Sequence, residues 1–516
     1  MEFFYKHRVL ITVVIYCGCF FLLYPLFRYI LDDDGIGYAM VTRRWAEGDF
    51  YNAINGYWSP LHSWIAIPFY KAGLGLVQSF HFSNILISIG ILIIVDLLAS
   101  KYEINHKKRF FFLLISVPLL IYMSYCQLAA DILFCFFFLL YIFHCSAGDS
   151  FTSKRKIVVC ALIAWCGYLS KAYGFPLFLV HFCLWQYWLS TRTLIPEPKK
   201  KLISNLITGI SVFLILSLPW IIVLHYKYHT WTFGYSGKLN LSWQLASPVA
   251  QINNGYIVPH LLNSPTPWED PWFSQSKLYS PFTSFSHLIR ECKVILHNVI
   301  AMIDSFHASS FLSLAILFSL FLYAVKTKSG MATLFLFSIL LLPLGYLLVH
   351  IEPRFLWPAT FLLLIASFHL LSFLFHTYRF PQYAKLICWI TLTASFLVPP
   401  LNALQDMAGS GKDVYSLSKD LEAHAIKGAF ASSQEEYSNM RKASFLSGNR
   451  YFESFEPDPS DEWTLSQIRS RKIEYYFLFY RNERQLRLFQ HSTLLNESTN
   501  KYFLPAHHLI ILKFAQ

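Results

Sequence analysis

The chain is 516 residues long; 55% of its residues are hydrophobic, only 14% are charged, and its mean hydropathy is +0.42. A soluble domain usually carries about 25% charged residues, so this composition excludes a purely soluble or a disordered protein. The formal net charge is +12, but the basic residues are spread between apolar blocks, which indicates membrane topology rather than nucleic-acid binding. The ten cysteines lie mostly in apolar stretches without a metal-type CxxC spacing, which argues against a disulfide framework or a zinc site.

The hydrophobic residues form blocks long enough to cross a bilayer, whose hydrocarbon core of about 30 Å needs about 20 apolar helical residues. The first block follows Lys6 and Arg8 and lacks a small-residue cleavage site, so we interpret it as a retained anchor rather than a cleaved signal peptide. The chain is therefore predicted to be a polytopic α-helical membrane protein. The eleven expected spans are 9–30, 82–100, 110–126, 129–146, 157–170, 174–190, 203–225, 308–325, 331–350, 355–375 and 385–402.

The distribution of Lys and Arg predicts the orientation of these spans. The N-terminal segment and every second short loop hold most of the basic residues, whereas the short loops on the other side hold only Lys171 and Arg354. Because cytoplasmic loops carry the excess of basic residues, we expect a cytoplasmic N-terminus in the plasma (inner) membrane. After eleven crossings the C-terminal segment would lie outside the cytoplasm, in the periplasm of a cell that has one.

Two domains follow from this topology. Residues 1–402 form the predicted membrane domain, which carries two long outer loops, 31–81 and 226–307. Residues 403–516 form a predicted extracytoplasmic domain, because the composition there becomes charged and mixed. Gly409-Ser410-Gly411 near the start of this segment is interpreted as a linker.

The C-terminal segment shows the patterns of a small α/β domain. Residues 472–480 and 508–514 are rich in aromatic and β-branched residues, which predicts strands. Residues 414–425 and 435–445 have the spacing of apolar residues that predicts helices.

The first outer loop opens with three consecutive carboxylates, Asp32, Asp33 and Asp34. Mutual repulsion beside the low dielectric of a membrane raises carboxyl pKa values, so one of the three could serve as a general base near neutral pH. The alternative is an acidic helix cap. One aspartate would suffice for a cap, so the run of three favours a functional site.

Residues 39–50, directly after the carboxylates, have the pattern of an amphipathic helix lying in the membrane interface. In this interpretation Met40 and Trp45 face lipid, and Arg43 and Arg44 face the head groups.

Further aromatic and histidine side chains are candidates for a site. Tyr57 and His62 lie in the aromatic stretch 55–64, which brings the chain back to the membrane surface. A second aromatic run at 228–235 could stack against sugar rings or rest on lipid, and we prefer the lipid-facing interpretation. His62 and His350 would more often be hydrogen-bonded structural histidines. With the aspartates they could also bind a divalent cation, but their scattered positions are a weak signal, and we predict no metal site.

Five short stretches of the chain combine acidic, basic, aromatic and proline residues at the ends of the expected spans: Asp33-Asp34, Arg43–Asp49, Trp58–Leu61, Ser170–Gly174 and His350–Pro358. These stretches resemble motifs of the GT-C glycosyltransferases, especially the protein O-mannosyltransferases and the aminoarabinose lipid A transferases. Asp131 also lies where these relatives carry an acidic residue that opens the fourth span. The sequence departs from the family pattern in having Asp-Asp for the usual Asp-Glu and a single Pro for the common Pro-Pro, which leaves the substrate open.

The resemblance implies that a sugar is moved from a polyprenyl-phosphate donor to an acceptor hydroxyl at the outer face of the membrane, with inversion. It implies that the first residue of the acidic pair is the base, but the spacing fits both Asp33 and Asp34, and Asp32 remains a third possibility. Arg354 and Lys171 would hold the donor phosphate. The residues expected to support the pocket are Asp131, Glu352, His62, His350 and Tyr57.

The acceptor could be a glycolipid, a growing polysaccharide or a protein side chain. Two other functions stay open: a transporter or flippase of a lipid-linked glycan, and a polysaccharide polymerase or ligase. A transporter would show repeats and mid-membrane ionisable residues, and a polymerase would carry more arginines in its long loop. Neither pattern is found in the sequence.

Overall fold

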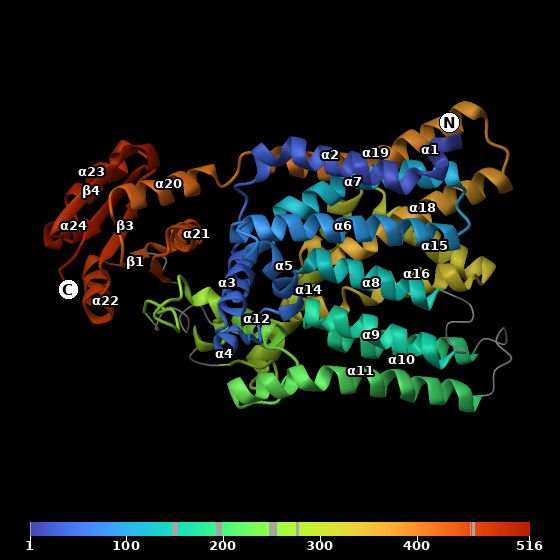
Figure 1. The fold of residues 1–516 in the computed structure, drawn as a ribbon, viewed down its shortest axis with the longest axis horizontal. Coiled ribbons are helices and arrows are strands. Elements are labelled where there is room, and N and C mark those ends of the chain that lie inside the picture. Colours follow the sequence, from blue (N-terminus) through green and yellow to red (C-terminus); the bar gives the residue numbers. More distant parts are fainter. Residues whose placement is uncertain are drawn as a thin grey trace.

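Long helices that run side by side form most of the molecule, and a small domain lies at one end of this bundle (Figure 1). The N-terminus lies at the opposite end of the bundle from the C-terminal domain. This is the predicted fold class, a polytopic helical protein with a small α/β domain. The computed structural model describes residues 2–146, 153–191, 199–246, 255–274, 278–454, 456 and 460–515.

Each predicted span coincides with helical residues. Among the described residues, seven helices are long and apolar enough to cross a membrane, and the pair α14–α15, bent by 97°, is a further candidate. Eleven crossings therefore stay a prediction. The bundle contains α2 (Arg8–Phe27), α6 (Leu76–Lys101), α7 (His106–Cys126), α8 (Asp131–Cys145), α9 (Lys154–Ser170), α10 (Gly174–Thr191), α11 (Lys199–Tyr228), α14 (Phe285–Ser309), α15 (Ser313–Thr327), α16 (Gly330–Leu341), α17 (Leu344–Leu347), η3 (Pro353–Leu356), α18 (Trp357–Thr377) and α19 (Gln382–Met407).

A buried ion pair holds the bundle together near the N-terminus, beside the short helix α1 (Glu2–Lys6). The Nε and Nη2 atoms of Arg8 on α2 each lie 2.7 Å from one carboxylate oxygen of Asp96 on α6. Arg109 on α7 lies 3.2 Å from the same carboxylate. Two guanidinium groups thus compensate one buried charge, and three helices are joined where α2 begins.

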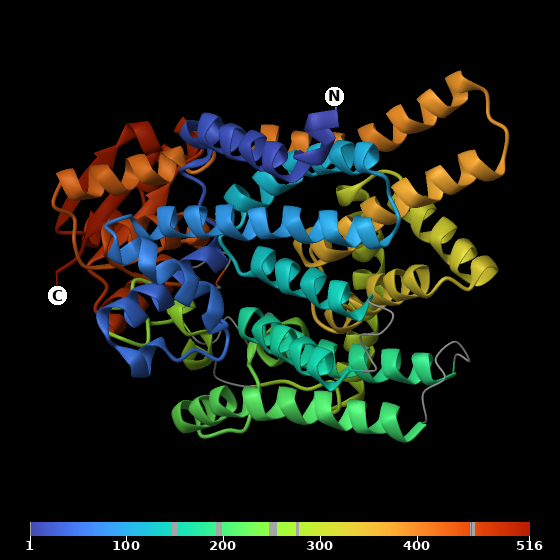
Figure 2. The same cartoon turned by 45° about the vertical axis from the view of Figure 1, so that its right-hand side comes forward.

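The first outer loop folds into α3 (Asp33–Glu47), α4 (Phe50–Ala53) and α5 (Pro60–Lys71). These helices, dark blue in Figures 1 and 2, lie at the end of the bundle that carries the C-terminal domain. Gly37 is required on α3, because a Cβ atom there would lie 2.3 Å from the Trp58 ring.

The prediction that residues 39–50 lie in the membrane interface is wrong for two of the side chains. Met40 is fully buried in an apolar cluster with Trp58. Arg44 is 1% exposed, and its Nε atom donates to Glu269 of the long outer loop over 2.7 Å. The aromatic run at 228–235 is likewise not uniformly on lipid, because Tyr228 and Tyr235 are buried. The pattern of an amphipathic helix did not reveal that a second loop covers its polar face.

The C-terminal domain is built on a five-stranded sheet of order β2-β1-β3-β5-β4. Strands β2, β1 and β3 are parallel, whereas β5 runs antiparallel to β3 and β4. The four predicted elements of this domain are confirmed as α20, α21, β3 and β5. Its elements are α20 (Lys412–Ala423), β1 (Ala429–Ser432), η4 (Gln434–Glu436), α21 (Tyr437–Ser447), β2 (Arg450–Phe452), α22 (Asp461–Arg471), β3 (Tyr475–Phe479), α23 (Glu483–Gln490), α24 (Thr493–Glu497), β4 (Asn500–Leu504), η5 (Pro505–His507) and β5 (Leu509–Lys513).

The predicted linker is a tight turn packed on the end of α2. The backbone N–H of Gly409 donates to the carbonyl of Leu26 over 3.1 Å. Gly411 has φ +84°, and a Cβ atom there would lie 2.1 Å from the carbonyl oxygen of Tyr29. Only glycine fits this conformation and this close approach, so the C-terminal domain is fixed against the bundle at this point.

A second attachment joins the C-terminal domain to the start of α3. The guanidinium of Arg441, on α21, binds Glu453 through two hydrogen bonds of 2.8 and 2.7 Å, and its Nη1 atom lies 3.2 Å from Asp33. Ser438 donates to the same aspartate over 3.0 Å. Arg441 and Glu453 are almost fully buried, so this ion-pair group holds the two domains together with little screening by solvent.

Replacing Arg441 with Met is expected to destabilise the C-terminal domain, because Glu453 would remain buried without its partner. Breaking a buried ion pair in this way costs about 3–5 kcal/mol. Pulse proteolysis of the full-length protein in urea would measure the shift in the unfolding midpoint.

The matched control is Arg469→Met, because the Arg469–Glu497 pair of the same domain is exposed and exposed pairs contribute about 0–1 kcal/mol. Equal midpoints for the two variants would contradict the role assigned to Arg441.

Candidate active site

A cavity of about 850 Å³ lies where the two outer loops meet the ends of several bundle helices. Its wall includes the start of α3, the turn before α8, the turn between α9 and α10, the helix α12 (Ser236–Leu245) of the long loop, and residues 341–355. Segments that are far apart in the sequence therefore share one cavity. The candidate residues Asp34, Tyr57, Asp131, Lys171, His350, Glu352 and Arg354 all line it.

Arg354 lies at the centre of the charged part of this cavity. Its Nη2 atom donates to Asp34 over 2.6 Å, and its Nη1 atom donates to Gln127 over 2.9 Å and lies 3.6 Å from Asp131. Its Nε atom lies 2.6 Å from Glu352. One guanidinium thus connects the first outer loop, the turn between α7 and α8, and the segment before α18.

Lys171 forms the second cationic position. Its Nζ atom pairs with Asp131 and lies 3.8 Å from the centre of the Phe355 ring. Burial lowers the pKa of Lys171, and the nearby charge of Arg354 acts in the same direction, while Asp131 favours the charged form. The two basic residues singled out by topology are therefore joined through one shared carboxylate.

The three consecutive aspartates have three different environments. Asp32 caps α3 by accepting from Gly35 over 3.0 Å and also accepts from Leu128 over 2.8 Å. Asp33 points to Arg441 of the C-terminal domain. Of the three, only Asp34 lines the cavity.

The environment of Asp32 also shows how these charges interact. Burial, together with the negative charge of Asp34, raises the pKa of Asp32 to about 6, although two backbone hydrogen bonds oppose the shift. Asp32 is thus close to its titration range at neutral pH, but both of its carboxylate oxygens accept backbone hydrogen bonds. This binding pattern is that of a helix cap, the alternative considered for this sequence.

Asp34 keeps one carboxylate oxygen available. Its contacts with Arg354 fall on Oδ2, and among the described residues no donor binds Oδ1. The side chain is 24% exposed. Asp131, in contrast, binds cations through both oxygens.

Glu352 and His350 form the rim of the charged group. His350 Nε2 lies 3.0 Å from Glu352 Oε1. Burial opposes the ionisation of Glu352, but His350 and Arg354 outweigh it and lower the pKa of Glu352 to about 2. Glu352 is therefore ionised at all physiological pH values and orients Arg354 rather than exchanging protons.

The structure places His62 outside the cavity wall. It is fully buried, its Nε2 atom lies 3.1 Å from the amide oxygen of Asn84, and its ring packs edge-on against Tyr38, which does line the cavity. Burial lowers the pKa of His62 to about 4, so this histidine is neutral at pH 7. Its position is that of a structural histidine.

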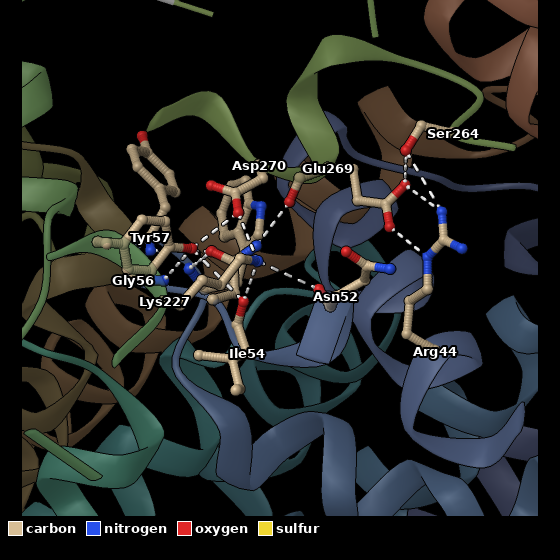
Figure 3. A network of polar contacts seen from close by, with 12 residues as sticks. Arg44, Asn52, Ile54, Gly56, Tyr57, Lys227, Ser264, Glu269 and Asp270 are labelled. Carbon is tan, nitrogen blue, oxygen red and sulfur yellow. Dashed lines mark hydrogen bonds and ion pairs between the residues drawn. The ribbon is translucent and has the colours of Figure 1, made fainter. Parts of the chain in front are cut away.

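A network of hydrogen bonds positions Tyr57, as Figure 3 shows. Lys227 at the end of α11 donates to the carbonyl of Ile54 over 2.5 Å and pairs with Asp270 over 2.9 Å. Asn55 accepts from the backbone N–H of Tyr57 over 2.9 Å. The first loop is thus fixed to α11 and to the long loop, and the Tyr57 hydroxyl is directed at Asn240, to which it donates over 2.9 Å.

The long loop supplies cavity residues that the sequence did not reveal. Asn240, Trp243 and Lys238 on α12 and Trp268 beside it line the cavity, and the two tryptophan rings are stacked with centroids 5.8 Å apart. No periodicity could indicate that α12 and the turn that carries Lys171 line the same cavity.

Another part of the cavity is apolar. Pro176, Leu177 and Val180 of α10 face it from one side, and Leu341, Leu344 and Leu348 from the other. Val180, Leu344 and Leu348 are also among the exposed apolar side chains of the bundle. The charged group and this apolar wall therefore belong to one continuous cavity that reaches the apolar surface of the helices.

Within the described part of the chain, no three His, Cys, Asp or Glu side chains are placed to hold a metal ion. The carboxylates that line the cavity are instead bound to Arg354 and Lys171.

No protein-family model and no curated protein sequence matches this chain, but solved structures do. The apo oligosaccharyltransferase of Archaeoglobus fulgidus matches with a TM-score of 0.56 at 10% identity, over 93% of this chain and 70% of that one. ArnT from Cupriavidus metallidurans bound to undecaprenyl phosphate matches with a TM-score of 0.54 at 11% identity, over 97% of both chains. Apo ArnT matches with a TM-score of 0.55 at 12% identity, over 98% of both.

These likenesses extend over almost the whole chain. At such low identities they concern the arrangement of the chain in space. The protein therefore has the fold of these oligosaccharyltransferase and ArnT structures, which agrees with the fold class predicted from the sequence.

Proposed function

We propose that this protein is a membrane glycosyltransferase that moves a sugar from a polyprenyl-phosphate donor to an acceptor hydroxyl at the outer face of the plasma membrane. One observation carries the proposal: a single cavity combines a carboxylate with an open oxygen, two cations and an apolar wall. Transfer from a lipid phosphate needs each of these three features. The structural relatives support the lipid-linked donor, since ArnT was solved with undecaprenyl phosphate and the archaeal oligosaccharyltransferase AglB with a dolichol-phosphate.

Asp34 is the proposed general base. The acceptor hydroxyl loses its proton to Oδ1 of Asp34 as its oxygen attacks the anomeric carbon of the sugar. The bond between that carbon and the phosphate oxygen breaks, and its electron pair stays on the phosphate. A single displacement of this kind inverts the anomeric configuration. It suits a site in which the other cavity carboxylates, Asp131 and Glu352, are already bound to cations.

Arg354 and Lys171 are the proposed partners of the leaving phosphate. Negative charge grows on that phosphate in the transition state, and fixed cations in a water-poor site stabilise such charge most strongly. Asp34, Asp131 and Glu352 hold both cations in position before substrate arrives. In this proposal Asp131, Glu352 and His350 are positioning residues for the two cations. Tyr57 lies in the part of the cavity that would receive the acceptor.

The apolar wall is the proposed path of the prenyl chain. With the phosphate at Arg354 and Lys171, the chain would leave between α10 and the α16–α17 pair, along Leu177 and Leu344. Each buried CH₂ group contributes about 0.8 kcal/mol, so a prenyl chain would bind here far more tightly than a free sugar phosphate. The donor would reach the cavity from the bilayer.

Asp34→Asn is expected to lower sugar transfer from a polyprenyl-phosphate sugar by roughly 10²–10⁴-fold, the usual contribution of a general base. The asparagine retains the size of the side chain but cannot accept the proton. Purified wild type and variant would be compared in single-turnover assays with the lipid donor.

The neighbouring carboxylates supply the controls. Asp33→Asn and Asp32→Asn are expected to change the rate far less, because neither side chain lines the cavity. A fully active Asp34→Asn enzyme, or a larger loss in Asp33→Asn, would refute the assignment of the base.

Arg354→Lys is expected to lower kcat by roughly 10²–10³-fold, the cost of removing one donor to a developing charge. A lysine retains the charge but cannot reach Asp34, Gln127 and Glu352 together. Steady-state kinetics with the same lipid donor would test this, and an unchanged kcat would exclude a role of the guanidinium in the transition state.

A further inference from the structure

The C-terminal domain has a cavity of its own, of about 840 Å³, which is as large as the cavity in the membrane domain. It lies outside the site described above, and none of the described residues lines both cavities. Its wall is formed by the first turns of α20 and α22, the ends of β1 and β3, and the helix α23.

This cavity lies at the topological switch point of the sheet. Strands β1 and β3 are adjacent and parallel, and the residues that directly follow them, Ser433 and Tyr480, line the cavity. The connection from β1 to β2 runs through α21, which packs with Phe430 on one face of the sheet. The connection from β2 to β3 runs through α22, which packs with Ala431 on the other face. In open α/β sheets, ligands bind in the crevice that such diverging connections leave at the carboxyl ends of the strands.

The side chains at this crevice disfavour an anionic ligand. Glu435 and Glu436 occupy the first turn after β1, the position at which nucleotide-binding sheets receive phosphate on free backbone N–H groups. Asp413 and Asp461 also line the cavity, and Arg481 is paired with Glu435. Ionised carboxylates only accept hydrogen bonds, so a ligand here must be rich in donors.

The remaining lining includes aromatic rings, amides, apolar side chains and the histidines His491, His507 and His508. Tyr480 and Phe489 present rings at the cavity, and Asn439 and Gln485 present amides. Rings beside carboxylates and amides match the chemistry of a saccharide, whose hydroxyl groups donate hydrogen bonds and whose C–H faces pack on aromatic rings. A linear polyamine would use the carboxylates but would have no need of the rings.

The helix α21 separates this cavity from the start of α3. Its Ser438 and Arg441 bind Asp33, the neighbour of Asp34, while Asn439 and the preceding Glu436 line the cavity of the C-terminal domain. At the other side Tyr415 of α20 packs against Tyr29 at the end of α2. The cavity is thus next to both the catalytic loop and the end of the bundle.

We propose that the cavity of the C-terminal domain is a second binding site, which holds an uncharged saccharide chain beside the transfer site. The inference rests on the proposed function in one respect: the saccharide would be the distal part of a glycan acceptor. The binding itself does not depend on catalysis.

The test measures binding to the full-length protein in detergent by isothermal titration calorimetry. The probes are the neutral tetrasaccharides chitotetraose, maltotetraose and cellotetraose, the anionic tetragalacturonate, and the polycation spermidine. At least one neutral tetrasaccharide is expected to bind, and tetragalacturonate is not. Failure of all three neutral saccharides, or binding of spermidine alone, would overturn the proposal.

Variants locate the binding. Tyr480→Ala and Glu436→Gln are each expected to weaken the affinity at least tenfold, whereas Arg469→Met, on the same domain but outside the cavity, leaves it unchanged. Saccharide binding that survives both cavity variants would overturn the proposal. Asp34→Asn is expected to bind saccharide like the wild type. Saccharide binding and sugar transfer are therefore measured independently, and a failure of the proposed transfer reaction can be distinguished from a failure of this site.

Discussion

The interaction on which the site depends is the guanidinium of Arg354 held among carboxylates. It binds Asp34 at 2.6 Å and lies close to Asp131 and Glu352, which belong to three separate parts of the chain. A buried charge of this kind is costly unless several partners compensate it. Because the charge of Arg354 must be compensated, the first outer loop, the start of α8 and the segment before α18 meet at its guanidinium. This meeting point is the proposed reaction centre.

The outer loops surround this centre as structured layers. The buried ion pair Arg44–Glu269 fixes the first loop to the long loop, and Lys227 at the end of α11 pairs with Asp270 and donates to the Ile54 carbonyl of the first loop. Arg441 then fixes the C-terminal domain to Asp33 and stacks 4.7 Å above Trp268, which lines the membrane-domain cavity. Two neighbouring aspartates therefore have separate tasks: Asp33 anchors the C-terminal domain, and Asp34 faces the proposed substrates. The C-terminal domain is in this way joined to the wall of the membrane-domain cavity.

The parts of the fold that depend on hydrophobic length were predictable from the sequence, and the parts that depend on long-range pairing were not. Apolar blocks located the helices of the bundle, and the scarcity of basic residues in the outer loops singled out Arg354 and Lys171, which do share a cavity. Nothing in the local sequence indicated the tertiary partners of Met40 and Arg44. The amphipathic pattern of residues 39–50 was therefore interpreted as a helix on the lipid surface, although the long loop covers its polar face at Arg44. The choice among Asp32, Asp33 and Asp34 depended on contacts with Leu128, Arg441 and Arg354, which no spacing rule contains.

The central claim is that a lipid phosphate binds between the two cations of the membrane-domain cavity. The most direct measurement is a cryo-EM structure of the protein in nanodiscs with undecaprenyl phosphate. We expect the phosphate within hydrogen-bond distance of Arg354 and Lys171, with the prenyl chain along Leu177 and Leu344. A lipid phosphate bound elsewhere on the bundle, with this cavity empty, would contradict the account.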